Sequence, residues 1–257
     1  MFISPNQIVE KPQRIISLVP SLTEFLFHLG LEEEVVGITK FCVHPTEWHR
    51  TKTRVGGTKQ IHHEIIKGLK PGLIIANKEE NTKEDIEKLA LEYNVLLTDI
   101  NNFDEALSGL NTIGAATYKK ERAGEIIAGV SQKFSELQIP ENPKTAVYLI
   151  WKDPYMSVGG DTFISSMLQK AGFENALQSQ NRYPQITIEE INKISPDVVF
   201  LSSEPYPFTQ KHLAEIQPQL LHSKVLLADG EMFSWYGSRM LMAADYFERL
   251  KDKSGYF

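Results

Sequence analysis

Short apolar runs alternate with amphipathic segments along most of the chain. The runs at 14–19 and 146–150 are largely aliphatic, as expected of buried strands, and each precedes a loop and a segment whose apolar positions have helical spacing. Both segments end at a glycine, Gly30 or Gly172, which is a common way to end a helix. Strands that alternate with helices in this way predict parallel sheets covered by helices, the α/β fold class.

The chain also repeats itself. At an offset of 125 residues, four positions of the first half fall on identical residues of the second: Glu64, Ile66, Pro71 and Glu79 on Glu189, Ile191, Pro196 and Glu204. At an offset of 130, the apolar run 95–97 falls on 225–227, and each run is followed by an aspartate, Asp99 or Asp229. Each half therefore reads as helix, proline, strand and acidic loop, and then a further strand.

The segment between the halves predicts one long helix. Residues 119–138 have apolar side chains at helical spacing, and Pro140 and Pro143 follow directly. We expect two Rossmann-like lobes with parallel sheets, joined by this helix, and a ligand cleft between the lobes. The expected boundaries are 1–116 for the N-terminal lobe, 117–139 for the connecting helix and 140–257 for the C-terminal lobe.

Charge and composition exclude several classes of protein. With 27 basic and 33 acidic residues the net charge is −6, which argues against binding to nucleic acid or an anionic membrane. The single cysteine excludes an internal disulfide. No run of 18 apolar residues occurs, and residues 1–14 contain no apolar core of a signal peptide. The sequence as written shows no export signal, although a chain whose leader had been removed would look the same.

Ligands of open parallel sheets bind beyond the carboxyl ends of the strands. The loops expected there are rich in aromatic and acidic residues, and the segment 229–239 combines acceptors, rings and an arginine. A packed corner between strand and helix is the alternative interpretation of that segment. The candidate ligand-binding residues are Phe41, Cys42, His44, Asn77, Glu79, Tyr155, Asp161, Tyr183, Glu204, Glu231, Trp235, Tyr236 and Arg239.

Metal binding and catalysis are weaker hypotheses. Cys42 and His44 could hold a soft or borderline metal together with Glu79 or Glu204, although a lone cysteine and a lone histidine are commonly packing and surface residues. The chain lacks the nucleophile-elbow, phosphate-loop, dinucleotide and zinc-protease motifs. Asp229 or Glu231 near Tyr236 could still serve acid–base chemistry, so a cleft enzyme is one alternative.

Several segments together resemble the helical-backbone (class III) substrate-binding proteins of ABC importers for cobalamin and ferric siderophores, and the cobalamin-binding branch most. The resemblance covers nearly the whole chain and rests on the order and spacing of residues 14–24, 70–75, 183–186 and 238–239. It implies two α/β lobes bridged by one long helix, and docking of one glutamate per lobe, here Glu64 and Glu189, to the two subunits of a permease dimer.

The resemblance also implies an aromatic ligand site with departures from the family pattern. Phe41, Tyr155 and Tyr183 match aromatic positions, whereas two tryptophan positions fall on Thr58 and Asn77. Positions that are acidic, aromatic and arginine in the family fall on Glu231, Met232 and Trp235. The acidic residues expected on the N-terminal side favour a cationic or metal-bearing ligand over an anionic siderophore.

The function expected is therefore a substrate-binding protein and not an enzyme. It would hold a corrinoid, ferric siderophore or other metal chelate, need no cofactor of its own, bind no nucleic acid and act as a monomer. Such a receptor would work outside the cytoplasm, in the periplasm or tethered to the membrane. If Met1 is the native start, the alternative is a cytoplasmic carrier of a corrinoid or metal chelate, or a cleft enzyme on the same scaffold.

Overall fold

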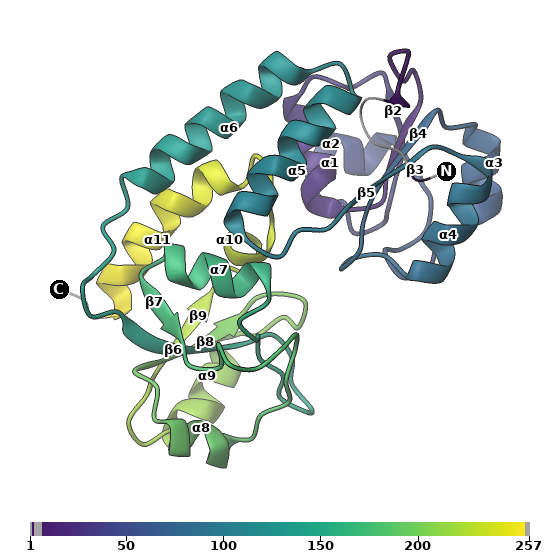
Figure 1. Cartoon of the computed structure of the whole chain (residues 1–257). Coiled ribbons are helices and arrows are strands. Elements are labelled where there is room, and N and C mark those ends of the chain that lie inside the picture. The colour runs from purple at the N-terminus through teal and green to yellow at the C-terminus, as the bar shows by residue number, and fades with distance from the viewer. Residues whose placement is uncertain (1, 3–6, 255–257) are drawn as a thin grey trace. The chain divides into compact units, whose positions relative to one another are not determined.

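The protein, analysed as a computed structural model, is described at residue 2 and residues 7–254 (Figure 1). It consists of two compact units that interleave along the chain. The first unit comprises Met1–Ile100, Asp104–Val130 and Tyr236–Arg239, and the second comprises Asn101–Phe103, Ser131–Trp235 and Met240–Phe257. Each unit contains one sheet whose strand pairs are all parallel, as the alternation of strands and helices predicted.

The sheet of the first unit has five strands in the order β3-β2-β1-β4-β5. Its central strands are apolar throughout; Ile16 pairs with Ile74 in the β1–β4 register. The elements are β1 (Ile15–Ser17), α1 (Pro20–His28), β2 (Val35–Ile38), α2 (Thr46–Thr51), β3 (Thr53–Arg54), α3 (His63–Leu69), β4 (Leu73–Asn77), α4 (Lys83–Glu92), β5 (Val95–Thr98) and α5 (Phe103–Ala116). Ile66, Ile86 and Leu89 of α3 and α4 pack against β1 and β4 in one buried apolar cluster.

The sheet of the second unit has four strands in the order β7-β6-β8-β9. The elements are β6 (Lys144–Leu149), α7 (Phe163–Lys170), β7 (Phe173–Asn175), α8 (Ile188–Ile194), β8 (Val198–Ser202), α9 (Gln210–Ile216), a 3₁₀ turn (Gln217–Gln219), β9 (Lys224–Ala228), α10 (Gly230–Ser234) and α11 (Met240–Ser254). Because side chains alternate along a strand, the two faces differ. Val199 and Leu201 pack with α8 and α9, whereas Phe200 joins an aromatic cluster with Tyr148 and Phe233.

The long helix expected at 119–138 is observed as α6 (Lys120–Ser135), and the unit boundary at Val130 and Ser131 falls inside it. The division at residues 116 and 139 did not foresee that Tyr236–Arg239 groups with the first unit. The reason is local: the Arg239 guanidinium forms two hydrogen bonds with the Glu24 carboxylate, at 2.9 and 2.7 Å, with both side chains buried. The Ser238 hydroxyl also lies 2.8 Å from Nδ1 of His28.

The internal repeat is present in the backbone. α3 and α8 both have seven residues, both end at a left-handed C-cap, Lys70 or Ser195, and both are followed by a proline and a five-residue strand. Beyond those strands, the Lys78 N–H donates to the Thr98 carbonyl at 3.0 Å, and the Ser203 N–H donates to the Ala228 carbonyl at 2.9 Å. Gly30 and Gly172 follow α1 and α7 with positive φ, as expected of helix-ending glycines.

Among the described residues, no helix combines the length and hydropathy that a bilayer-spanning segment requires.

Candidate functional site

The loop after β4 is organised by Asn77, the last residue of the strand. Its buried side chain accepts hydrogen bonds from the Glu79 N–H at 2.8 Å and the Glu80 N–H at 3.3 Å, and donates to the Thr98 hydroxyl at 3.0 Å. Asn81 extends this network, because its side-chain amide donates to the carbonyls of Leu18 and Thr58. Asn77 therefore shapes the acidic loop from within the protein rather than offering its own side chain to a ligand.

Glu79 and Glu80 lie in that loop, close to Lys59. The Lys59 ammonium donates to the Glu79 carbonyl at 2.6 Å. Burial raises the pKa of the Glu80 carboxyl, and the positive charge of Lys59 opposes that shift. Among the described residues no hydrogen-bond donor is found for the Glu80 carboxylate, although its own N–H donates to Asn77. The loop thus holds a partly desolvated carboxyl group that a cation or a ligand's donor could stabilise.

Phe41 gives the first unit an exposed aromatic face. Half of the side chain is accessible, and the Lys40 ammonium lies 5.0 Å from the ring centroid. A Cβ at Gly57 would lie 3.1 Å from the Phe41 ring, so a residue without a side chain lets the ring lie close to the backbone. His44, three residues further on, is half-buried.

The structure places Cys42 in the interior, which contradicts the expectation that its side chain is accessible to a ligand. The side chain is completely buried, and its sulfur lies 3.0 Å from the Thr23 hydroxyl, which donates to it, and 3.2 Å from that of Thr39. Burial raises the pKa of the Cys42 thiol, which disfavours the thiolate that metals bind. Among the described residues, no group of three or more histidine, cysteine, aspartate or glutamate side chains could hold a metal ion.

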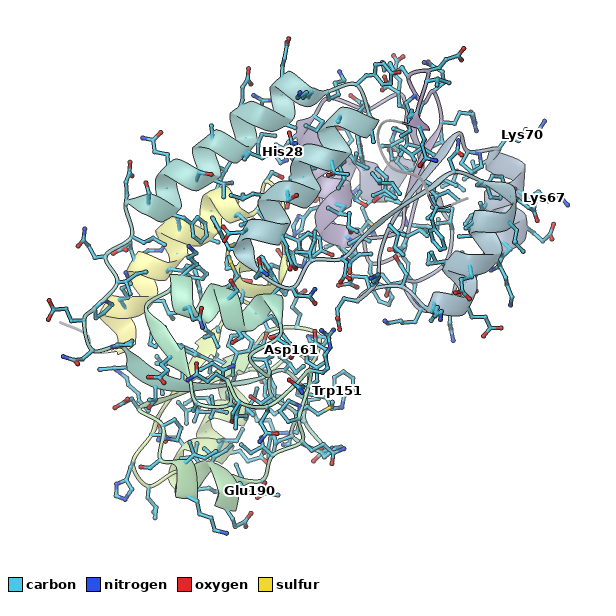
Figure 2. The ribbon with its side chains drawn as sticks, viewed as in Figure 1. His28, Lys67, Lys70, Trp151, Asp161 and Glu190 are labelled. Atoms are coloured by element: carbon cyan, nitrogen blue, oxygen red, sulfur yellow. The ribbon has the colours of Figure 1, made fainter. Side chains whose placement is uncertain are left out.

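In the second unit, Asp161, which is labelled in Figure 2, and Arg182 shape the loop that carries Tyr183. One carboxylate oxygen of Asp161 accepts from the Arg182 N–H at 2.5 Å, and the Arg182 guanidinium lies 5.7 Å from the Tyr183 ring centroid. Arg182 adopts a left-handed backbone conformation with φ 55°, which this hydrogen bond supports. Tyr183 is half-buried, so part of its ring remains accessible.

Glu204 follows β8 and is held by the segment 229–239. Oε1 of Glu204 accepts hydrogen bonds from the Ser234 hydroxyl at 2.5 Å and from the Trp235 indole N–H at 2.9 Å. Gly230 makes this approach possible, because a Cβ there would lie only 2.4 Å from Cγ of Glu204. The carboxylate is thus fixed by two donors that converge on one of its oxygens.

Most candidate side chains of the segment 229–239 are packed in the interior. This agrees with the alternative interpretation of the segment as a packed corner between strand and helix. Trp235, Tyr236 and Arg239 are at least nine-tenths buried, and Arg239 is paired with Glu24. Asp229 caps α10 by accepting from the Glu231 N–H at 3.2 Å, while Glu231 itself is half-buried. Glu231 is therefore the most accessible of the four candidate residues in this segment, the others being Trp235, Tyr236 and Arg239.

Sequence reasoning missed Trp151, two residues after β6. Its side chain, which is labelled in Figure 2, is 42% exposed. Its ring packs edge-on against Tyr206 at 5.8 Å between centroids. Tyr206 in turn lies 3.2 Å from Nε2 of His212 through its hydroxyl. Tyr155, which was predicted, is half-buried nearby in the chain, and burial raises its pKa. A tryptophan directly after the apolar run 146–150 was the signal available, since ligands gather at strand carboxyl ends.

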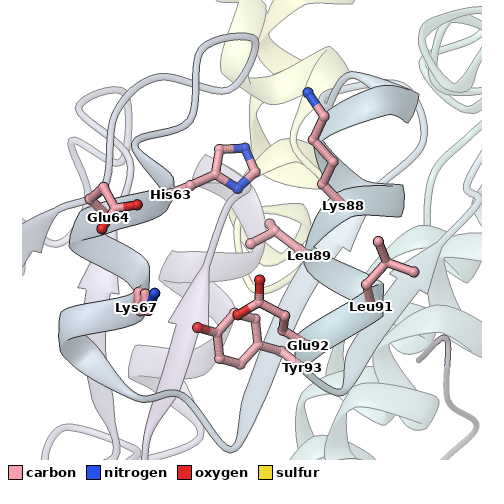
Figure 3. Close-up of a pocket in the computed structure, with 8 residues that line it drawn as sticks. All are labelled: His63, Glu64, Lys67, Lys88, Leu89, Leu91, Glu92 and Tyr93. Carbon is pink, nitrogen blue, oxygen red and sulfur yellow. The ribbon is translucent and has the colours of Figure 1, made fainter.

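Glu64 and Glu189 occupy equivalent places in the two units. Each is exposed in the first turn of a seven-residue helix, α3 or α8. A concavity of about 250 Å³ lies between α3 and α4. Figure 3 shows that Glu64 helps to line it, together with Lys67 and Tyr93. Both carboxylates are therefore accessible to a partner.

Comparison with known proteins gives one consistent picture. The model of the family described as "Periplasmic binding protein" matches residues 15–224. A vitamin B12-binding protein of Pectobacterium atrosepticum is 26% identical over 245 residues, which cover 91% of this chain and 86% of that protein. An uncharacterized ABC transporter substrate-binding lipoprotein of Bacillus subtilis is 28% identical over 203 residues, 75% of this chain, and the match spans 64% of the lipoprotein.

Solved structures with the same fold are more distant in sequence. The apo form of a periplasmic heme-binding protein from Roseiflexus sp. superposes with a TM-score of 0.78 at 20% identity, covering 94% of this chain and 99% of that one. The periplasmic vitamin B12-binding protein of Vibrio cholerae superposes with a TM-score of 0.72 at 20% identity, covering 95% and 98%. These likenesses establish the two-lobed α/β fold.

Proposed function

Because the chain belongs to the periplasmic binding protein family, we propose that it is the substrate-binding protein of an ABC importer. The observation that carries the proposal is that each lobe presents an exposed aromatic ring near the carboxyl end of its sheet, Phe41 in one and Trp151 in the other. Rings presented in this way suit a ligand with flat apolar faces. The protein would bind its ligand without changing it.

The ligand proposed is a metal-bearing chelate or macrocycle, such as a corrinoid, haem or ferric siderophore. The relatives named for vitamin B12 and the structural neighbours named for heme support this class. The acidic loop that carries Glu80 favours a ligand with a positive centre or several donors, because a desolvated carboxyl group gains most from such groups. The candidate contacts are Phe41, His44, Glu79, Tyr155, Tyr183, Glu204 and Glu231, with Trp151 added.

The proposal includes a permease partner. Glu64 and Glu189, one on each lobe, would meet basic groups on the two subunits of a membrane permease, and exposed carboxylates of this kind set register and association rate. The protein would act outside the cytoplasmic membrane, as a periplasmic or membrane-tethered receptor. The relative from B. subtilis is named as a lipoprotein, which supports this location.

A thermal-shift screen tests the binding function. Purified protein is heated with cobalamin, cobinamide, haemin, ferric hydroxamate, ferric catecholate and free divalent metals in turn. A ligand at 100 times its dissociation constant stabilises the fold by about 2.7 kcal/mol, which raises the melting temperature by roughly 5 °C. We expect a shift with one chelate class and recovery of that chelate unchanged. No shift with any chelate would contradict the proposal, and chemical conversion of the chelate would indicate an enzyme.

A further inference from the structure

Two highly exposed leucines occupy equivalent positions in the internal repeat. The exposed fraction is 86% for Leu91 and 74% for Leu221. The offset of 130 that places Val95 on Val225 also places Leu91 on Leu221. The local structures differ, because Leu91 lies in the last turn of α4 and Leu221 lies in the loop after the 3₁₀ turn. A shared local conformation therefore does not account for an exposed leucine at both positions.

Leu91 lines the same concavity as Glu64, the proposed docking carboxylate of the first lobe, from the opposite wall (Figure 3). It lines the concavity between α3 and α4 together with Glu64, Lys67, Glu92 and Tyr93 (Figure 3). Glu64 and Lys67 are three residues apart in α3, so they share one face of the helix. One surface of the first lobe therefore combines an accessible carboxylate with a leucine that the fold does not bury.

Leu221 is tied to the corresponding helix of the second lobe. Its N–H donates to Oδ1 of Asn192 at 3.1 Å, and the Asn192 amide donates to the Gln219 carbonyl at 2.8 Å. Asn192 follows Glu189 by three residues in α8, and it is the repeat equivalent of Lys67. In both lobes, the residue one turn after the acidic side chain thus lies next to the segment that carries the exposed leucine.

We propose that Leu91 and Leu221 are apolar anchors for the permease, one on each lobe, each in a segment next to the helix that carries Glu64 or Glu189. The inference rests on the proposed function and specifies its partner: each permease subunit offers a basic group to the glutamate and an apolar socket to the leucine. The partner is a two-fold protein because the same combination occurs once in each half of the chain. A buried apolar side chain beside a charge pair is the common design of an interface anchor.

The experiment measures binding of the ligand-loaded protein to permease in nanodiscs by biolayer interferometry. The candidate ABC permeases of the source organism are tested in turn, and the one that binds the wild-type protein is used. The variants are Leu91→Ser, Leu221→Ser and their combination, with Glu64→Ala/Glu189→Ala as a comparison. Ile139→Ser and Met242→Ser are matched controls, because these side chains are 57% and 53% exposed and lie in other segments. Thermal shift with the identified chelate verifies that every variant folds and binds its ligand.

We expect each leucine variant to weaken permease binding by about tenfold and the double variant by about a hundredfold, with the controls unchanged. Normal binding by the leucine variants together with loss of binding by the glutamate variant would overturn the anchors and leave the proposed docking intact. Normal binding by both sets would overturn both ideas. Equal loss of binding to empty nanodiscs would assign the leucines to the lipid surface and overturn the protein partner.

Discussion

The loops that follow β4 and β8 have a similar backbone arrangement at the strand end. They differ in the hydrogen bonds that their glutamate side chains make. In both, the last residue of the strand accepts a hydrogen bond from the N–H two positions on: Asn77 from Glu79 at 2.8 Å, and Ser202 from Glu204 at 3.3 Å. In the second lobe the loop glutamate is held by two donors, whereas in the first lobe Glu80 adds a carboxyl that lacks a donor among the described residues. The repeat thus retained the geometry of the strand end while the two lobes diverged in electrostatics.

Because of this difference, we expect the two loops to contribute differently to ligand binding. A carboxylate already bound by Ser234 and Trp235 gains little from a ligand, because its hydrogen-bonding capacity is partly used within the lobe. A desolvated carboxyl beside Lys59 gains more from a positive centre or a donor. We therefore expect the first lobe to supply more of the electrostatic selectivity, and the rings around Trp151 to supply contact area in the second.

Removing the organising side chains should have the largest effect, and it should be larger in the first lobe. Asn77→Ala deletes four hydrogen bonds inside the protein and should lower the free energy of unfolding by about 3 kcal/mol. Ser202→Ala removes a smaller hydroxyl and should cost about 1.5 kcal/mol, mostly by leaving the buried Tyr148 hydroxyl without its acceptor. Urea denaturation measures both variants, and equal costs would contradict the comparison.

Filling the space beside Glu204 should have the next largest effect. Gly230→Ala places a Cβ 2.4 Å from Cγ of Glu204 and 2.6 Å from the Ser202 hydroxyl, so the loop must move at a cost of about 2 kcal/mol. Gly124→Ala is the matched control: apart from the backbone of α6 itself and the two chain neighbours, nothing lies within 4 Å of its Cβ position, so this change should stabilise the helix by about 0.8 kcal/mol. Thermal unfolding of both variants distinguishes strain at Gly230 from a general effect of glycine replacement.

Truncating the exposed rings should affect ligand binding rather than folding. Phe41→Ala and Trp151→Ala should each weaken binding of the identified chelate by about tenfold, or about 1.4 kcal/mol, through lost contact with its flat faces. Isothermal titration measures the affinity. Tyr118→Ala is the control, because that ring is 51% exposed in the first unit and lies outside the strand-end loops. If the two variants lost no more affinity than this control, the result would contradict a role of Phe41 and Trp151 in ligand binding.

The smallest expected effect concerns Glu80 and depends on pH. Burial raises the pKa of Glu80 in the folded protein, so the folded state binds its proton more readily than the unfolded chain. Ionisation therefore costs stability as the pH rises through the folded pKa. Glu80→Gln should stabilise the protein by about 1 kcal/mol at pH 7, and the difference should fade as the pH drops toward about 4.

Urea titrations at a series of pH values measure this dependence. Glu87→Gln is the control, because that side chain is 55% exposed in an ion pair with Lys83. A Glu80→Gln effect that persisted unchanged at low pH would assign the stabilisation to packing instead of charge.

Much of the fold was predictable because its strands and helices follow from the local spacing of apolar residues along the chain. The apolar run 95–97 and its copy at 225–227 became β5 and most of β9, and the glycines at 30 and 172 follow helices as expected. The helix predicted at 119–138 is α6, which ends three residues earlier, at Ser135. Helix ends depend on fine backbone geometry, which a periodic pattern does not determine.

The candidate site was predictable only in part. Loop position identified Phe41, Glu79 and Glu204 correctly as side chains near strand ends, but it did not distinguish an exposed ring from a buried thiol one residue away at Cys42. It also did not separate Asn77, which faces inward, from its neighbours. Successive side chains in a loop point in different directions, and only the packing of Thr23 and Thr39 around the sulfur places Cys42 in the interior.

The class of fold, the internal repeat and the family could be predicted from the amino-acid sequence, because they follow from the spacing of apolar residues and of a few matched positions along the chain. Which of those residues are accessible to a ligand or a partner depends on the tertiary structure. It paired Arg239 with Glu24, 215 positions away in the chain, and it left Leu91 and Leu221 exposed at equivalent positions. Burial and pairing between distant residues depend on how the chain packs in space, and local sequence patterns do not encode that packing.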